Sequence, residues 1–298
     1  MIDFSCKHDV MIENEDGSLL PMDEPYFTSK VIAPGTWLIR TDGDAIYLLE
    51  GNEQAIVIDS GYGAGDLREY CQSLTEKPVK YIINTHDHFD HTANNSYFEK
   101  AYMTAASKEL ATIPFPSFEG IDFPRDYPVE IVKDGDVIDI GERPLEIIEM
   151  PDHAVGSIVI LDKKERILFA GDEISSMFKK VNTGISNVRA QYQRLWDRKD
   201  EFDTIWPGAG VSCKADILKT YIEIFDAILS GEKGEAGFGF KGPDEKMKKK
   251  EPAEDTGRVV FQRFHARKCD MKMEKDAKEL RNIKKDGVMV MFTPDVIK

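Results

Sequence analysis

The chain alternates between short apolar runs and polar turns, a pattern that predicts many buried strands. The runs expected to form strands are residues 36–40, 45–50, 55–59, 79–84, 145–150, 157–161, 166–169 and 203–206. Because these runs are largely apolar along their length, they are typical of sheets covered on both faces. A turn at residues 134–136 predicts that residues 129–140 form a hairpin. Apolar residues at helical spacing predict helices near residues 67–74, 188–196 and 217–228. A further helix is expected to start within residues 92–98.

The two ends of the chain differ from this pattern. Residues 1–30 are acidic and irregular and are expected to form an N-terminal arm of a domain that spans residues 1–232. Residues 233–298 are expected to be a linker rich in Gly, Lys, Glu and Pro, followed by a small C-terminal α/β extension. Its predicted elements are a strand at 258–264, a helix around 276–283 and a strand at 288–292. We expect this extension to act as a lid or as the contact of a homodimer.

Charge and cysteine content narrow the range of partners. The 298 residues include 39 Lys plus Arg and 54 Asp plus Glu, which gives a net charge of −15. Phosphate backbones would repel so acidic a chain, so we expect no nucleic-acid partner. No basic and apolar leader opens the sequence, and no apolar segment reaches the ~20 residues of a membrane span, so a cytoplasmic location is expected. The four cysteines are scattered and form no CxxC pair, as in reduced intracellular proteins.

Residues 86–91 carry a dense group of side chains that bind metals. Three of the six histidines lie here, together with Asp87 and Asp90. Imidazole and carboxylate are ligands for zinc, iron or manganese. In an extended backbone His86 and His88 point to the same side, whereas the adjacent Asp90 and His91 need a turn that directs them elsewhere. This spacing suits two neighbouring metal ions, and the alternative is a polar turn that happens to be rich in histidine.

Two more residues of the same kind follow predicted strands. His153 comes shortly after the strand at 145–150, and Asp172 comes directly after the strand at 166–169. In layered α/β proteins, functional sites gather beyond the carboxyl ends of strands. We therefore expect these residues to converge with His86.

The order of these residues resembles the metallo-β-lactamase superfamily, whose motif is His-x-His-x-Asp-His followed by a His, an Asp and a last His. The matching metal ligands are His86, His88, Asp90, His91, His153 and Asp172. Asp59 resembles the family's strand-end aspartate, which does not bind the metal itself but supports the residues that do. The resemblance covers about residues 31–230 and implies a four-layer αββα sandwich with the site along one edge. It also implies one or two Zn²⁺ ions as cofactor, with Fe or Mn as other metals, and Asp172 as the bridge of a binuclear centre.

One position departs from the family pattern. The last histidine of the family lies in a Pro-Gly-His-Gly-like turn, whereas this turn is Pro207-Gly208-Ala209-Gly210. The second metal would then lack one imidazole. Three explanations stay open: a natural member with one firm and one weak metal, a degenerate member, or a histidine-to-alanine replacement that disables the protein. Cys213 or His265 could supply a substitute ligand, although a packed thiol and a tail-strand histidine are the simpler interpretations.

The resemblance implies a metal-dependent hydrolase that acts on a small molecule: an ester, lactone, thioester or amide. A metal-activated hydroxide would attack the carbonyl. Asp90 would act as the catalytic residue, because it would orient the hydroxide and carry its proton to the leaving group. The alternatives are an inactive metal-binding member, and a phosphodiesterase or nuclease of the same superfamily. The charge of −15 argues against a nuclease.

Overall fold

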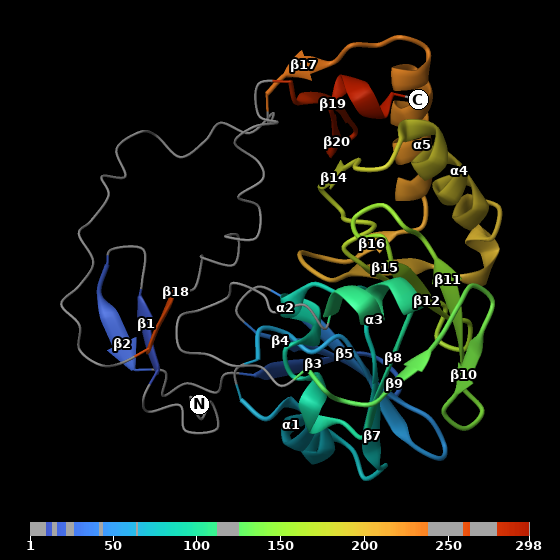
Figure 1. Ribbon diagram of the computed structural model, residues 1–298. Helices are drawn as coiled ribbons and strands as arrows, with labels where there is room; N and C mark the ends of the chain where they lie inside the picture. The colour runs from blue at the N-terminus through green and yellow to red at the C-terminus, as the bar shows by residue number, and fades with distance from the viewer. Residues whose placement is uncertain are drawn as a thin grey trace.

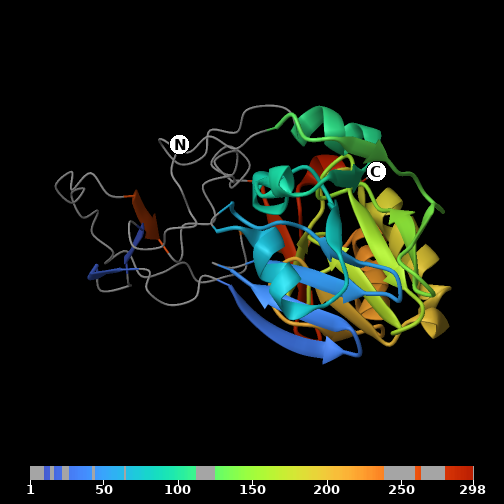
Figure 2. The same ribbon diagram turned by 90° about the horizontal axis from the view of Figure 1, so that it is seen from below.

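Two β-sheets lie face to face between outer helices in the computed structural model (Figure 1). The structure describes residues 10–13, 17–21, 27–41, 44–63, 65–111, 125–237, 259–262 and 279–297. Figure 2 shows α1 on one side of the paired sheets and α4 and α5 on the other. The four-layer αββα sandwich expected from the sequence is therefore confirmed.

The first sheet has seven strands in the order β3-β4-β5-β6-β7-β8-β9. They are β3 (Thr28–Ala33), β4 (Thr36–Arg40), β5 (Ala45–Glu50), β6 (Ala55–Ile58), β7 (Val79–Ile83), β8 (Lys100–Met103) and β9 (Val129–Ile131). The pairs from β3 to β6 are antiparallel, and those from β6 to β9 are parallel. The carboxyl ends of β6 and β7 therefore lie side by side at one edge.

The second sheet has six strands in the order β10-β11-β12-β13-β15-β16. They are β10 (Val137–Asp139), β11 (Pro144–Glu149), β12 (Ile158–Asp162), β13 (Ile167–Gly171), β15 (Thr204–Pro207) and β16 (Cys213–Lys214). Only the β13–β15 pair is parallel. The loops after β11, β13 and β15 hold His153, Asp172 and Ala209.

Alternate residues of the central strands build separate layers of core. In β5, Tyr47 and Leu49 pack between the sheets, whereas Ile46 and Leu48 pack toward α1 (Leu67–Leu74) and α3 (Ala105–Ala111). The residues of β12 also alternate: one set packs between the sheets, and the other packs toward α4 (Ile185–Trp196) and α5 (Ile217–Leu229). Both faces of each central strand are buried, which explains why the apolar runs do not alternate with polar residues. Helix α1 begins where the Asp66 side chain accepts a hydrogen bond from the backbone N–H of Glu69 at 2.9 Å.

The predicted hairpin at residues 129–140 is wrong. Strand β9 lies at the edge of the first sheet beside β8, and β10 lies at the edge of the second sheet beside β11. The turn at Asp134 and Gly135 exists, but it carries the chain from one sheet to the other. A turn signal is local, whereas the choice of partner strand depends on residues far along the chain.

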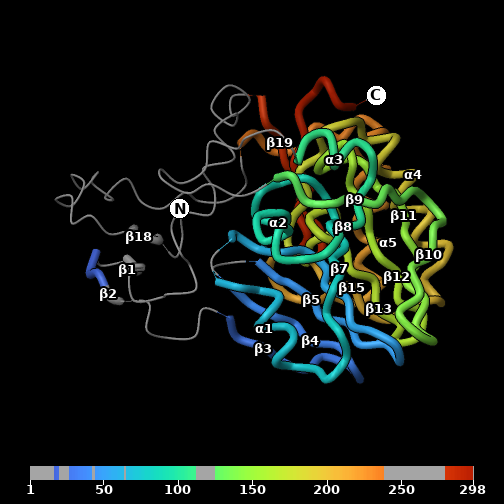
Figure 3. The backbone as a smooth tube through the Cα atoms, turned by 60° about the horizontal axis from the view of Figure 1, so that its bottom comes forward, coloured from blue at the N-terminus to red at the C-terminus, as the bar shows by residue number. Residues whose placement is uncertain are grey.

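The N-terminal arm and the predicted helix after residue 92 also differ from expectation. Residues 1–30 include β1 (Val10–Glu13), β2 (Leu19–Pro21) and the start of β3, so the arm is not wholly irregular. Strand β1 lies between β2 and β18 (Val259–Gln262), and this three-stranded sheet lies apart from the two main sheets (Figures 1 and 3). Helix α2 (Phe89–Thr92) begins before residue 92, and a short 3₁₀ helix at Asn95–Tyr97 follows it.

The C-terminal segment contains a hairpin where part of a helix was expected. Strands β19 (Arg281–Lys285) and β20 (Val288–Phe292) pair around Asp286 and Gly287, which both have positive φ. An Asp-Gly pair between two strands is a strong hairpin signal, so the prediction of a helix up to residue 283 is wrong at its described end. The hairpin also pairs with β14 (Phe178–Lys180) and β17 (Glu235–Ala236). Its apolar residues join the core around α4 and α5. A role as lid or homodimer contact stays a prediction.

Candidate metal centre

Asp59, at the end of β6, fixes the residues that follow β7. Its Oδ1 accepts the backbone N–H of Thr85 at 2.7 Å, and its Oδ2 accepts the Thr85 hydroxyl at 2.8 Å. The same Oδ2 lies 2.9 Å from Nδ1 of His91. A carboxylate only accepts hydrogen bonds, so His91 donates from Nδ1. Burial lowers the pKa of His91, but the carboxylates of Asp59, Asp90 and Asp172 outweigh it and raise that pKa well above its usual range, so a metal at Nε2 would displace a proton. The supporting role expected for Asp59 matches this geometry.

Thr85 sets the orientation of His86 in the same way. Its one hydroxyl proton goes to Asp59, so the Thr85 oxygen accepts from Nδ1 of His86 at 3.0 Å. The lone pair of His86 then lies on Nε2. The Nε2 atoms of His86 and His91 are buried and have no hydrogen-bond partner among the residues that the structure describes. Buried polar atoms without a partner are rare and indicate that something absent from the polypeptide binds there.

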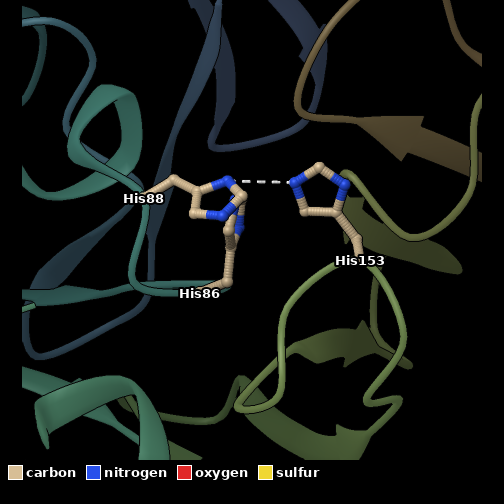
Figure 4. Close-up of side chains that lie close together, drawn as sticks. All are labelled: His86, His88 and His153. Carbon is tan, nitrogen blue, oxygen red and sulfur yellow. Dashed lines mark hydrogen bonds between the residues drawn. The ribbon is translucent and has the colours of Figure 1, made fainter. Parts of the chain in front are cut away.

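Three imidazoles form the first group of candidate ligands (Figure 4). His86 and His88 come from the loop after β7, and His153 comes from the loop after β11. Their ligand nitrogens lie within 4.8 Å of one another, and Nδ1 of His88 is 3.0 Å from Nε2 of His153. Two nitrogens that bind one tetrahedral Zn²⁺ at about 2.05 Å lie about 3.3 Å apart. The spacing therefore fits a single small metal ion.

Asp172 links this group to a second one. Its Oδ2 lies 3.6 Å from Nε2 of His153, and its Oδ1 lies 3.8 Å from Nε2 of His91. Asp90 contributes an oxygen 3.7 Å from the same His91 nitrogen. The structure thus brings together all six ligands expected from the sequence, with Asp172 between the two groups.

One residue of the cluster was missed by sequence reasoning. A carboxylate oxygen of Asp44 lies within 4.8 Å of the ligand atoms of Asp90 and His91, and Asp44 is only 6% exposed. Asp44 stands just before β5, whereas the expected ligands all follow strands. The only local signal is an acidic residue at the start of a fully buried strand, which is an uncommon place for an unpaired charge.

Burial and mutual repulsion make the cluster electrostatically unfavourable without a cation. Burial, followed by the neighbouring Asp90 carboxylate, raises the pKa of Asp44 well above its usual range. Burial also raises the pKa of Asp90, and burial together with His91 holds the pKa of His86 well below normal. Burial raises the pKa of Asp172 too, but His91 and His153 outweigh it, and the net direction is downward. A divalent cation would relieve both the crowded carboxylates and the unpaired imidazole nitrogens.

A buried ionic group locks the His153 loop to the Asp172 loop. Oε1 of Glu173 accepts the backbone N–H groups of Asp152 and His153, at 3.1 and 2.6 Å. Nζ of Lys179 lies 2.8 Å from Oδ2 of Asp152 and forms an ion pair with Glu173. Lys179 is in β14 and is 2% exposed. Two candidate ligands, His153 and Asp172, are therefore held in place by one ammonium group.

The turn that holds Ala209 lies against the same cluster. A Cβ atom on Gly208 would stand 2.5 Å from Oδ1 of Asp172 and 3.0 Å from Cε1 of His91, so any side chain there would displace the Asp172 carboxylate. Ala209 forms an isolated β-bridge with Asp44. Cys213 packs against the helical core and its thiol lies 3.9 Å from the carbonyl of Ile205, as the packed-thiol interpretation predicted. His265 lies outside the described residues.

Comparison with known proteins agrees with this geometry. The sequence model of the metallo-beta-lactamase superfamily matches residues 40–199. The chain belongs to this superfamily. The predicted resemblance is confirmed, and the donor set fits the divalent metals that the family binds.

Individual relatives are more distant. The human acyl-coenzyme A thioesterase MBLAC2 is 32% identical over 160 residues, which are 43% of this chain and 57% of that protein. A hydroxyacylglutathione hydrolase from Rhodospirillum rubrum is 30% identical over 101 residues, 33% of this chain and 35% of that protein. The chain thus matches little more than half the length of the first of these curated relatives and about a third of the second. A metallo-beta-lactamase from Pontibacter korlensis has the same fold, with a TM-score of 0.54 and 19% identity over 67% of this chain and 99% of that one.

Among the described helices, none combines the length and apolar character needed to cross a bilayer.

Proposed function

We propose that this protein is a metal-dependent hydrolase that cleaves a thioester of a small molecule. The observation that carries the proposal is the placement of Asp172 between His153 on one side and His91 on the other. Such a shared carboxylate is suited to two adjacent metals. Two of the relatives are named for acyl-coenzyme A and hydroxyacylglutathione, substrates in which sulfur carries the acyl group.

The candidate ligands divide into two sets. His86, His88 and His153 would hold one metal, and Asp90 and His91 would hold the other, with Asp172 shared. Zinc is the proposed metal, with iron or manganese as alternatives. When bound, such a metal acts as a Lewis acid and lowers the pKa of a water ligand to about 7.

The chain's own residues would supply orientation and proton transfer. Asp59 and Thr85 fix the imidazoles of His91 and His86, so that their Nε2 atoms face the cluster. Asp90 would accept the proton of the attacking water and pass it to the leaving group. A thiol with a pKa of about 8.5 leaves with less help from an acid than an alcohol or an amine does. A thioester is therefore the substrate that a centre lacking the last histidine would cleave most readily.

A substrate panel with measured metal content tests the proposal. Protein loaded with zinc or manganese is assayed on acyl-coenzyme A and S-acylglutathione thioesters, a lactone, a β-lactam and a phosphodiester. We expect thioester hydrolysis that a chelator removes and that His86→Ala lowers by about a hundredfold or more, since even indirect changes at metal sites cost 10- to 100-fold. A fully loaded protein that cleaves other substrates but no thioester would contradict the proposal. Hydrolysis of the phosphodiester alone would favour the phosphodiesterase alternative.

Three further expectations belong with this function. A cytoplasmic location, the absence of a nucleic-acid partner and a homodimer stay predictions. The net charge of −15 supports the second of them. Gel filtration of the full chain would test the third.

A further inference from the structure

The side chain of Asp44 has no visible reason to be buried unless it binds a cation. It is 6% exposed, and its Oδ2 accepts no hydrogen bond from the described residues. The groups that face it are the carboxylates of Asp90, Asp172 and Asp59 and one imidazole, His91. An unpaired carboxylate in such a place is strongly disfavoured, because burial removes its water and no hydrogen bond replaces it.

The backbone places Asp44 opposite the alanine that lacks a ligand atom. Asp44 and Ala209 form an antiparallel β-bridge, and the N–H of Ala45 donates to the carbonyl of Gly208 at 2.7 Å. These contacts tie the start of β5, in the first sheet, to the loop after β15, in the second. Ala209 is exposed and offers no ligand atom, whereas the residue bridged to it brings a buried carboxylate.

We propose that Asp44 is a metal ligand that completes the second half of the centre in place of a donor at position 209. Its oxygen joins those of Asp90 and Asp172 and the free Nε2 of His91. The inference rests on the proposed metal site, but not on thioesterase activity.

The two halves of the centre then differ in chemistry. The first half offers three imidazole nitrogens from His86, His88 and His153. The second offers one nitrogen, from His91, and oxygens from three carboxylates. Nitrogen-rich sites suit zinc, whereas sites rich in carboxylate also suit harder cations such as Mn²⁺. We therefore expect a mixed centre, with zinc in the first half and a second ion that manganese can supply.

A titration with manganese tests this assignment directly. Metal-free protein receives one equivalent of zinc and is then titrated with Mn²⁺, and free Mn²⁺ is measured by electron paramagnetic resonance. We expect one Mn²⁺ per chain for the unaltered protein and a Kd raised by about tenfold or more in Asp44→Asn. The control is Asp203→Asn, which changes a carboxylate that pairs with Arg166 and belongs to none of the donor groups found among the described residues. Equal Mn²⁺ affinity in Asp44→Asn and the unaltered protein would overturn the proposal.

Thermal unfolding separates a ligand from a residue that only supports the fold. Without metal, Asp44→Asn should melt at the same temperature as the unaltered protein or higher, because it removes a buried charge without a partner. With zinc and manganese, it should melt lower, because bound metal stabilises the folded state less. An equal loss in both conditions would assign Asp44 a structural role and refute the inference. A chain that binds both metals with Asp44 but cleaves no thioester would leave this inference standing and reject only the proposed function.

Discussion

Replacing Lys179 with methionine should destabilise the fold and loosen the metal centre together. Methionine keeps most of the side-chain volume but removes the ammonium group that Asp152 and Glu173 share. These two carboxylates are as buried as the lysine, with side chains 0% and 2% exposed, so neither can turn to water. Removing one partner of a buried ion pair costs about 3–5 kcal/mol, because it leaves an uncompensated charge.

That loss is large beside the whole stability of a domain, which is of the order of 5–15 kcal/mol. At about 2 °C for each kcal/mol in a chain of this size, it corresponds to a drop in Tm of about 6–10 °C. Because Glu173 also holds the backbone N–H of His153, we expect weaker metal binding as well. Urea unfolding of metal-free protein measures the first effect, and a chelator competition measures the second.

Two further variants make this test specific. Lys180→Met alters the next residue of β14, whose side chain points to the other face of the strand, and should change stability by less than about 0.5 kcal/mol. Adding Asp152→Asn and Glu173→Gln to the Lys179→Met protein should recover most of the loss, since no buried charge then remains. If Lys179→Met unfolds at the same urea concentration as the unaltered protein, the ionic group does not hold the two loops.

The remaining predictions concern single contacts. Gly208→Ala should push Asp172 and His91 out of place and weaken metal binding, seen as less metal retained after dialysis, whereas full retention would show that the turn can shift. Asp59→Asn should lower metal affinity by about 10- to 100-fold, measured by chelator competition, because an amide no longer holds His91 as firmly in its Nε2 form; unchanged affinity would exclude this role. The side-chain contact of Glu201 with Arg198 lowers the glutamate pKa to about 2, so it should stabilise the fold above pH 4.5, and this contribution should vanish as the pH falls toward 2; a carbon-13 titration giving an ordinary glutamate pKa would refute it.

The strands and the ligands that follow them could be predicted because their signals are local. The apolar composition of a run such as residues 79–84 is enough to predict a buried strand. His86 and Asp172 follow such runs closely in the sequence. Helix α1 was predictable for the same reason, since Leu67 and Cys71 fall on its buried face.

Features that depend on pairing between distant segments could not be predicted. Asp44 meets Ala209 only because the two sheets touch at one edge, and no short pattern encodes that bridge. The strand after Gly135 joined the second sheet for a similar reason. In the tail, by contrast, the Asp286-Gly287 turn is itself a local signal, and it favours the observed hairpin over the predicted helix.

The pairing of β14 with β20 has a consequence for how the protein is made. Lys179 lies in a strand whose parallel partner, residues 288–292, leaves the ribosome long after His153 and Asp172. During synthesis the two ligand loops therefore exist before the strand that steadies their shared lysine. A chain arrested between β14 and β20 should contain every candidate ligand and still capture metal poorly. A nascent chain would then bind metal firmly only after the C-terminal hairpin has left the ribosome and paired with β14.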